Sequence, residues 1–579
     1  MKRLAWICTS VLLLVLGVWA AVDLVTAPPD PAKLLPDGAL LYIQAKDFQG
    51  LLNDWNSSNE KRLWLKGDDY AAFSRSRLFG RLSQAQSEYS TAATIPTDES
   101  LLTSVAGQQS ALALYDIGNL EFVYLTRMDQ ARIEATPLWR LRDKFEQRTE
   151  GNTQFYVRQD VQSNRTAAFA ARDGWLVLGT RADLVAGVID RLQGAQTHSL
   201  AGESWYADTL KLAKSPAADL RMAINLEKVV PSPYFRSYWV QRNITEMKQY
   251  RAALCDLHRT KQDYREERVL LRKPGATTAN SGDVQSLMAL VPNDAVFSSA
   301  LAAPDLDRVL AEVRDNILEL KPERAQAIWT APPAPQQVNA GSAADFESRI
   351  DVAPVIVART DPYQSLRAIL TSAQPTGLLN IYATPSSKDQ MFVTIDRAIV
   401  IQSATPWNAE GVQSAITAAI RPGLTASQIG VEWIQKTAPA GNYFALDGQV
   451  QMFLAVGATR LFLSTNESLL QALLAKDQQH PGATSTGVTY AAVFRHSPRE
   501  QQNFRKIVDR LDSVNGGNQS APDTNADAEG GADGRTPPFF SGNVAGLSRA
   551  FADVVRESIE EKDQGELVTQ TVVYQWKRP

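Results

Sequence analysis

The sequence is poor in the residues and motifs that usually carry chemistry. Its 579 residues include two cysteines and four histidines. Cys8 lies in an apolar N-terminal segment, so Cys255 is the one thiol left for the folded part, which therefore cannot form an internal disulfide. H-E-x-x-H, a Walker A loop, G-x-G-x-x-G and G-x-S-x-G are absent. We therefore expect no cofactor, no metal site and no catalytic residue, and we expect that the protein is not an enzyme.

The sequence also lacks an excess of positive charge. It has 59 Lys and Arg against 63 Asp and Glu, a net charge of −4. A general nucleic-acid binder needs a basic face that displaces counterions from phosphates. The charge balance therefore argues against a nucleic-acid partner.

Long apolar runs are missing except at the N-terminus. Lys2 and Arg3 precede an uncharged run over residues 4–22, which ends at Asp23. A helix of that length spans roughly 28 Å, close to the hydrocarbon thickness of a bilayer. The flanking charges predict a single-pass signal anchor in the inner membrane, with a cytoplasmic N-terminus and the bulk in the periplasm. A cleaved signal peptide is the alternative, because small residues precede two candidate cleavage sites.

The stretch that follows the anchor is repeated later in the chain. Pro36-Asp37-Gly38 precedes an apolar run and then Asp47, while Pro292-Asn293-Asp294 precedes an apolar run and then Asp305. Each copy predicts a turn, a strand, and an Asp N-cap that opens an amphipathic helix.

Two further blocks recur in the same order. Trp175–Thr180 and Arg460–Thr465 each predict an apolar strand followed by a helix with one apolar face. Near the ends of the two copies, Ala253–Leu257 and Ala550–Val554 each precede a predicted strand. Three blocks in series indicate an internal duplication.

Composition sets the expected domain boundaries. Residues 1–29 hold the anchor and the start of a Pro-rich spacer, 30–273 the first half, 274–283 a polar linker and 284–579 the second half. Residues 513–538 are Gly-, Asn- and Asp-rich and predict a disordered loop. Closely spaced strands in each half predict an α+β fold, with mainly antiparallel sheets that carry helices on one face.

Several short motifs resemble reactive sites but fit structural roles better. Cys255 and His258 would share a helix face, yet no other cysteine could complete a zinc site, so we interpret Cys255 as a core thiol. Asp523, Asn525 and Asp527 lack the Gly and Glu that a calcium loop needs. Ser58-Asn-Glu-Lys61 and Ser464-Thr-Asn466 match serine-nucleophile spacings by chance.

The densest unusual segment is Pro231–Arg242, which we predict to open a helix that continues through Leu254 and Leu257. Aromatic residues and Arg are enriched at binding hot spots. The candidate partner-binding residues are Tyr234, Phe235, Arg236, Tyr238, Trp239 and Arg242. The alternative is that the aromatic side chains anchor this helix to the sheet.

The N-terminal anchor, LLPDGALLYIQAKDF, RLFGRL and PSPYFRSYWVQRN together resemble an uncharacterised bacterial envelope family, known as a domain of unknown function. The resemblance implies an envelope location and supplies no catalytic residues. Our first hypothesis is a membrane-anchored, non-enzymatic binding or scaffolding module for an envelope protein or ligand. The alternatives are an envelope hydrolase with a carboxylate-based site and a carrier of lipids or hydrophobic ligands.

Overall fold

The protein is described by a computed structural model over residues 29–66, 70, 73–213, 218–238, 247–260, 263–275, 284–293, 295–318, 361–383, 396–424, 432–447, 451–479, 487–495 and 554–576. The apolar run 4–22, most of the expected linker and the expected loop 513–538 lie outside this range. Within it, no helix has both the length and the apolar character needed to cross a bilayer.

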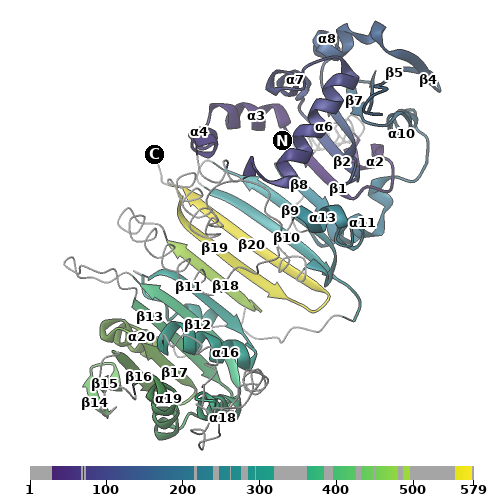
Figure 1. Cartoon of the computed structure of the whole chain (residues 1–579). Helices are drawn as coiled ribbons and strands as arrows, with labels where there is room; N and C mark the ends of the chain where they lie inside the picture. Colours follow the sequence, from purple (N-terminus) through teal and green to yellow (C-terminus); the bar gives the residue numbers. More distant parts are fainter. Residues whose placement is uncertain are drawn as a thin grey trace, which may run out of the picture. The chain divides into compact units, whose positions relative to one another are not determined.

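The described chain forms two compact units, and the α+β class with antiparallel strands is confirmed (Figure 1). Unit 1 comprises residues 1–279, 508–557 and 563–579, and unit 2 comprises 280–507 and 558–562. The C-terminal strand β20 (Leu567–Trp576) therefore belongs to unit 1, although it follows unit 2 in the chain. Strand β19 (Val554–Asp563) is divided between the units.

Unit 1 is built on one antiparallel sheet with the order β4-β5-β6-β7-β3-β2-β1-β8-β9-β10-β20. Its strands are β1 (Leu41–Ala45), β2 (Ser110–Asp116), β3 (Glu121–Arg127), β4 (Glu146–Glu150), β5 (Thr153–Gln159), β6 (Thr166–Arg172), β7 (Trp175–Gly179), β8 (Leu220–Ile224), β9 (Tyr250–Arg259) and β10 (Asp263–Arg272).

Helices cover both faces of the sheet in unit 1. They are α2 (Pro31–Leu34), α3 (Phe48–Ser57), α4 (Asn59–Lys66), α6 (Arg77–Ala93), α7 (Glu99–Val105), α8 (Gln130–Ala135), α9 (Pro137–Arg140), α10 (Ala182–Leu192), α11 (Ser204–Leu212), α12 (Leu226–Val229) and α13 (Pro233–Tyr238). On β7, Val177 packs in the core under α10 and α11, whereas Leu176 and Leu178 pack in the core under α6 to α9. The expectation of helices on one face is wrong because the strands at this point are apolar at consecutive positions, so both faces need cover.

Unit 2 has a sheet with the order β14-β15-β16-β17-β13-β12-β11-β18. Its strands are β11 (Ala295–Ala302), β12 (Pro375–Ala383), β13 (Asp396–Ser403), β14 (Glu432–Ala438), β15 (Gly441–Asp447), β16 (Met452–Val456), β17 (Arg460–Ser464) and β18 (Tyr490–Arg495). Its helices are α15 (Gln285–Met288), α16 (Leu306–Val313), α18 (Gln364–Ala373), α19 (Ala409–Leu424) and α20 (Glu467–Gln479). Phe462 of β17 packs with α20 and its neighbours Leu461 and Leu463 pack with α18 and α19, so this sheet is also covered on both faces.

The two predicted Asp N-caps are confirmed. The Asp47 carboxylate accepts a hydrogen bond from the Gly50 amide at 2.9 Å and opens α3. The Asp305 carboxylate accepts one from the Arg308 amide at 2.7 Å and opens α16. Each cap satisfies one of the amide groups that a helix leaves unpaired at its start.

The predicted helix through Leu254 and Leu257 is wrong, because both residues lie in strand β9. Ala252, Leu254 and Asp256 are buried, and the residues between them are only partly buried. This alternation is the period of a strand with one face toward a core. Cys255 and His258 are three positions apart on that strand and therefore point to opposite faces, so they cannot form one site.

Candidate functional site

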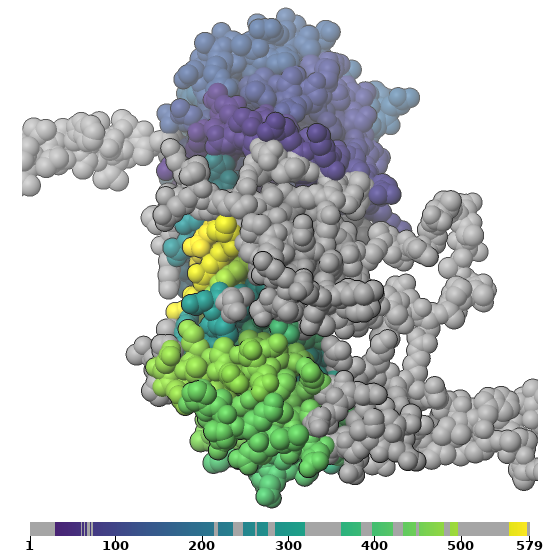
Figure 2. All heavy atoms as spheres, turned by 90° about the vertical axis from the view of Figure 1, so that its left-hand side faces the viewer, coloured from purple at the N-terminus to yellow at the C-terminus, as the bar shows by residue number. Residues whose placement is uncertain are grey.

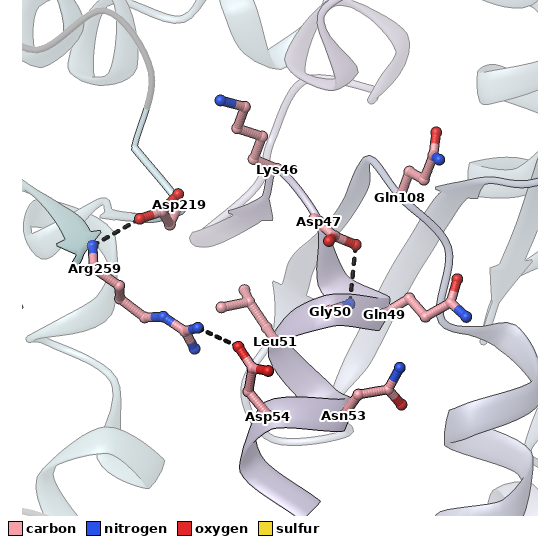
Figure 3. A pocket seen from close by; sticks show the side chains of 10 residues that line it. All are labelled: Lys46, Asp47, Gln49, Gly50, Leu51, Asn53, Asp54, Gln108, Asp219 and Arg259. Atoms are coloured by element: carbon pink, nitrogen blue, oxygen red, sulfur yellow. Dashed lines mark hydrogen bonds and ion pairs between the residues drawn. The ribbon is translucent and has the colours of Figure 1, made fainter. Parts of the chain in front are cut away.

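A hollow of unit 1 lies beside α3, where β1 and β9 end and β8 begins (Figure 3). Its volume is about 650 Å³. The lining residues are Lys46, Asp47, Gln49, Gly50, Leu51, Asn53, Asp54, Gln108, Asp219 and Arg259. Because Leu51 is the one large apolar side chain among them, the hollow suits a polar ligand.

Helix α3 forms one wall, and local sequence fixes its position. The chain leaves β1 at Ala45, and Asp47 caps the helix two residues later. The amides of Phe48 and Gln49 donate to the carbonyls of Gln108 and Gly107, each at 2.9 Å. These bonds hold the first turn of α3 against the segment that leads into β2.

A charged bridge links α3 to the end of β9. The Arg259 guanidinium lies 2.6 Å from a carboxylate oxygen of Asp54, and the Arg259 amide donates to Asp219 at 2.7 Å (Figure 3). The Asp219 carbonyl accepts from the Lys46 amide at 3.0 Å. Asp219 thereby connects the ends of β1 and β9. Asp54 connects α3 to the end of β9 through Arg259.

The polar groups left for a ligand are at the rim. The Lys46 ammonium has no partner among the described residues, and Lys46, Asn53 and Gln108 are all exposed. A lysine offers three donors and one positive charge, and the two amides offer both donors and acceptors. The hollow can therefore bind a polar molecule that carries a negative group. Among the described residues, no three His, Cys, Asp or Glu side chains gather as a metal site would require.

Two of the six predicted partner-binding residues have described side chains. Tyr234 is 52% exposed and its ring lies over Gly118, where an added Cβ would come within 2.5 Å of it. Phe235 is buried in a small core with Leu226 and Val229. The backbone of Arg236 and Tyr238 belongs to α13, their side chains are not described, and Trp239 and Arg242 lie outside the described residues. The role of this segment stays a prediction.

The remaining motif residues make structural contacts. The Ser58 hydroxyl accepts from the Lys61 amide at 3.1 Å, at the start of α4, and the Lys61 ammonium lies 2.7 Å from Glu99. Ser464 is fully buried, and its hydroxyl donates to the carbonyl of Asn466 at 2.8 Å. Burial and, next in importance, the nearby Glu266 carboxylate together raise the pKa of the Cys255 thiol to about 11. These contacts fit the interpretation that the motifs are chance matches, while Asp523, Asn525 and Asp527 lie outside the described residues.

Sequence reasoning identified Asp47 as a cap and missed the other residues of the hollow. Lys46 lies in the stretch LLPDGALLYIQAKDF but has no predicted role there, and Asp54, Asp219 and Arg259 belong to no motif. Asp54 and Arg259 are 205 positions apart. A usable signal was the charged pair Lys46-Asp47 at the end of an apolar strand, since polar groups at strand-to-helix junctions often line sites.

Comparison with known proteins assigns no family to the chain and finds only distantly similar solved structures. No protein-family model matches the chain, and no curated protein matches it. Among solved structures, crystal form I of TP0453 is similar at 10% identity and a TM-score of 0.26, over 44% of this chain and 82% of that chain. Crystal form III of TP0453 gives 11% identity and a TM-score of 0.24, over 44% of this chain and 84% of that chain. Similarity at this level supports no conclusion about fold or function.

Proposed function

We propose that the chain is a membrane-anchored envelope protein whose folded part is a non-enzymatic binding module, and that the hollow at α3 holds its ligand. The observation that carries the proposal is that the three carboxylates of the hollow already have structural hydrogen-bond partners. Asp54 and Asp219 both bind Arg259, and Asp47 caps its own helix, so the three carboxylates serve to build the site. Lys46, Asn53 and Gln108 remain to contact a ligand.

This arrangement favours binding over hydrolysis. A carboxylate-based hydrolase needs one carboxyl group as a proton donor and a second as a base or nucleophile. In this hollow the Asp54 carboxylate pairs with the Arg259 guanidinium, and the Asp219 carboxylate accepts from the Arg259 backbone amide, so both carboxylates already have structural partners. The polar lining also argues against a hydrophobic ligand in this hollow. A polar envelope molecule with a carboxylate or another anionic group fits Lys46 and the two amides.

The envelope location rests on the sequence: on the apolar run over residues 4–22 and its flanking charges. The family resemblance noted above agrees with it. Attaching the chain to the membrane would hold the folded part where envelope glycans and peptides are concentrated.

Strand order supports the related proposal that the two units are copies of one fold. Strands β1 to β8 lie in the order β4-β5-β6-β7-β3-β2-β1-β8, and strands β11 to β18 lie in the same order with each number raised by ten. The hairpins β9–β10 and β19–β20 each consist of two ten-residue strands. The charged hollow is a point of difference, because Pro304 precedes the cap Asp305 where Lys46 precedes Asp47.

Photo-crosslinking in cells tests the ligand site. A photoreactive amino acid at Asn53 should give adducts that the same group at Val161 does not, since Val161 is 96% exposed but lies on the β5–β6 turn. Lys46→Ala should reduce the Asn53 adducts several-fold. Equal adducts at the two positions, or adducts that do not change with Lys46→Ala, would contradict the proposed site.

A further inference from the structure

A cluster of aromatic side chains lies outside the buried cores of unit 1. The ring centroids of Trp64 and Tyr70 are 6.3 Å apart, those of Tyr70 and Phe79 are 6.4 Å apart, and those of Phe73 and Phe79 are 5.4 Å apart. All three pairs meet edge to face, the arrangement that aromatic rings prefer. None of the four residues is fully buried: Trp64 lies on α4, Phe79 on α6, and Tyr70 and Phe73 between the two helices.

Large aliphatic side chains extend this surface into solvent. Leu65, next to Trp64 on α4, is 47% exposed, and Leu82 on α6 is 43% exposed. Leu82 lies three positions after Phe79, so the two side chains share a helix face. Figure 2 shows purple atoms of the N-terminal part of unit 1, to which α4 and α6 belong, at the surface. Aromatic and leucine side chains held together at a surface indicate contact with an apolar partner.

The charge of this region is opposite to that of the whole chain. Residues 61–82 contain six Lys and Arg and two Asp, a net charge of +4, in a protein of net charge −4. Arg62, Lys66 and Arg77 are exposed and have no ion-pair or hydrogen-bond partner among the described residues. Lys61 and Arg81 are used internally, on Glu99 and on the carbonyl of Gly118. Three available cations therefore border the exposed leucines.

We propose that this aromatic–basic patch, formed by Arg62, Trp64, Leu65, Lys66, Arg77 and Leu82, rests on an anionic lipid surface. Aromatic and leucine side chains enter the headgroup boundary, while Lys and Arg attract anionic headgroups. Each cation near such a surface contributes about 1 kcal/mol, or about fivefold in the bound-to-free ratio. This second contact goes beyond the proposed ligand site, and the expected anchor over residues 4–22 would favour it by keeping unit 1 close to the bilayer.

A lipid surface fits the patch better than a protein groove. The patch combines exposed leucines with cations that nothing in the described chain neutralises, and a bilayer supplies diffuse negative charge without requiring a matching shape. A protein partner would have to neutralise three separate cations as well as cover the leucines. That alternative is one outcome of the following experiment.

The test uses the full chain with Cys8→Ser and Cys255→Ser, reconstituted in vesicles that contain doxyl-labelled lipid. An environment-sensitive fluorophore is attached at Leu65→Cys in one sample and at Val161→Cys in the matched control. With vesicles of phosphatidylcholine and phosphatidylglycerol, quenching at position 65 should exceed quenching at 161 several-fold. The anchor cannot cause this difference, since it tethers both labels equally.

Charge reversal completes the test. Arg62→Glu, Lys66→Glu and Arg77→Glu together should bring quenching at position 65 down to the level at 161, with unchanged circular dichroism, since all three side chains are exposed. Equal quenching at 65 and 161, quenching that is the same in vesicles of phosphatidylcholine alone, or quenching that survives the charge reversal would each overturn the proposal. Protection of position 65 from aqueous quenchers without doxyl quenching would point to a protein partner and would also overturn it.

Discussion

Arg221 of β8 and Asp256 of β9 face each other across adjacent strands and form a two-pronged ion pair. The guanidinium Nε and Nη2 atoms lie 2.6 Å and 2.7 Å from the two carboxylate oxygens. The Asp256 side chain is 1% exposed and the Arg221 side chain 12% exposed. A two-pronged geometry satisfies both carboxylate oxygens at once, which is what lets a charge remain stable in a buried position.

Removing one partner of this pair should strongly destabilise unit 1. Asp256→Ala leaves the Arg221 charge buried without a partner, and we expect a loss of roughly 3–5 kcal/mol in the free energy of unfolding. Asp208→Ala is the matched control, because it breaks an ion pair with Arg251 whose side chains are 36% and 31% exposed, and it should cost about 0–1 kcal/mol. Urea denaturation with hydrogen exchange at β8 and β9 measures both. Equal losses in the two variants would show that burial of the Arg221–Asp256 pair does not matter.

Two glycines of unit 1 should respond to alanine in opposite directions. A Cβ at Gly107 would lie 2.2 Å from the Arg127 carbonyl oxygen, so Gly107→Ala should lose roughly 1–3 kcal/mol of stability. Gly80, inside α6, has open space around its Cβ position, and Gly80→Ala should gain about 1 kcal/mol from helix propensity. Thermal denaturation of both variants decides the point. An unchanged stability of Gly107→Ala would mean that the Gly107 segment can move away from β3. The Gly107 carbonyl, which accepts from the Gln49 amide at the start of α3, would then move as well.

Local signals predicted much of the fold. The predicted apolar strands Trp175–Thr180 and Arg460–Thr465 correspond to β7 and β17, each of which ends one residue earlier than predicted. Asp47 and Asp305 were recognisable as caps because a cap bonds to an amide three residues away, within one stretch of sequence.

Long-range features could not be predicted in this way. β9 was mistaken for a helix because Asp256 interrupts its apolar alternation, and that carboxylate is buried only because Arg221 faces it from another strand. The hollow depends on Asp54 and Arg259, which the fold brings together from distant parts of the chain. Such pairs leave no periodic pattern, since each partner alone resembles an ordinary surface charge.

The Cys255 thiol should react slowly with alkylating reagents. Its pKa is raised from 9.0 to about 11, first by burial and then by Glu266, so its thiolate fraction near pH 8 should be about a hundredfold lower than that of an unperturbed thiol. Because the raised pKa favours the neutral form, the rate should keep rising with pH until about 11. Iodoacetamide labelling of the Cys8→Ser protein, folded and in urea, measures the profile. A folded-state midpoint near 9 would mean that the β9 environment does not disfavour the thiolate.

The two Asp caps provide a matched pair that separates stability from ligand binding. Asp47→Ala and Asp305→Ala each remove one side-chain cap, and each should cost about 1 kcal/mol, seen as faster hydrogen exchange in α3 and α16 respectively. Only α3 carries the charged hollow, with Asn53 and Asp54 on its second turn. Asp47→Ala should therefore also weaken photo-crosslinking from Asn53, whereas Asp305→Ala should leave it unchanged. If both variants weaken the crosslinks equally, the ligand depends on overall stability or on both units, and the hollow at α3 is not its specific site.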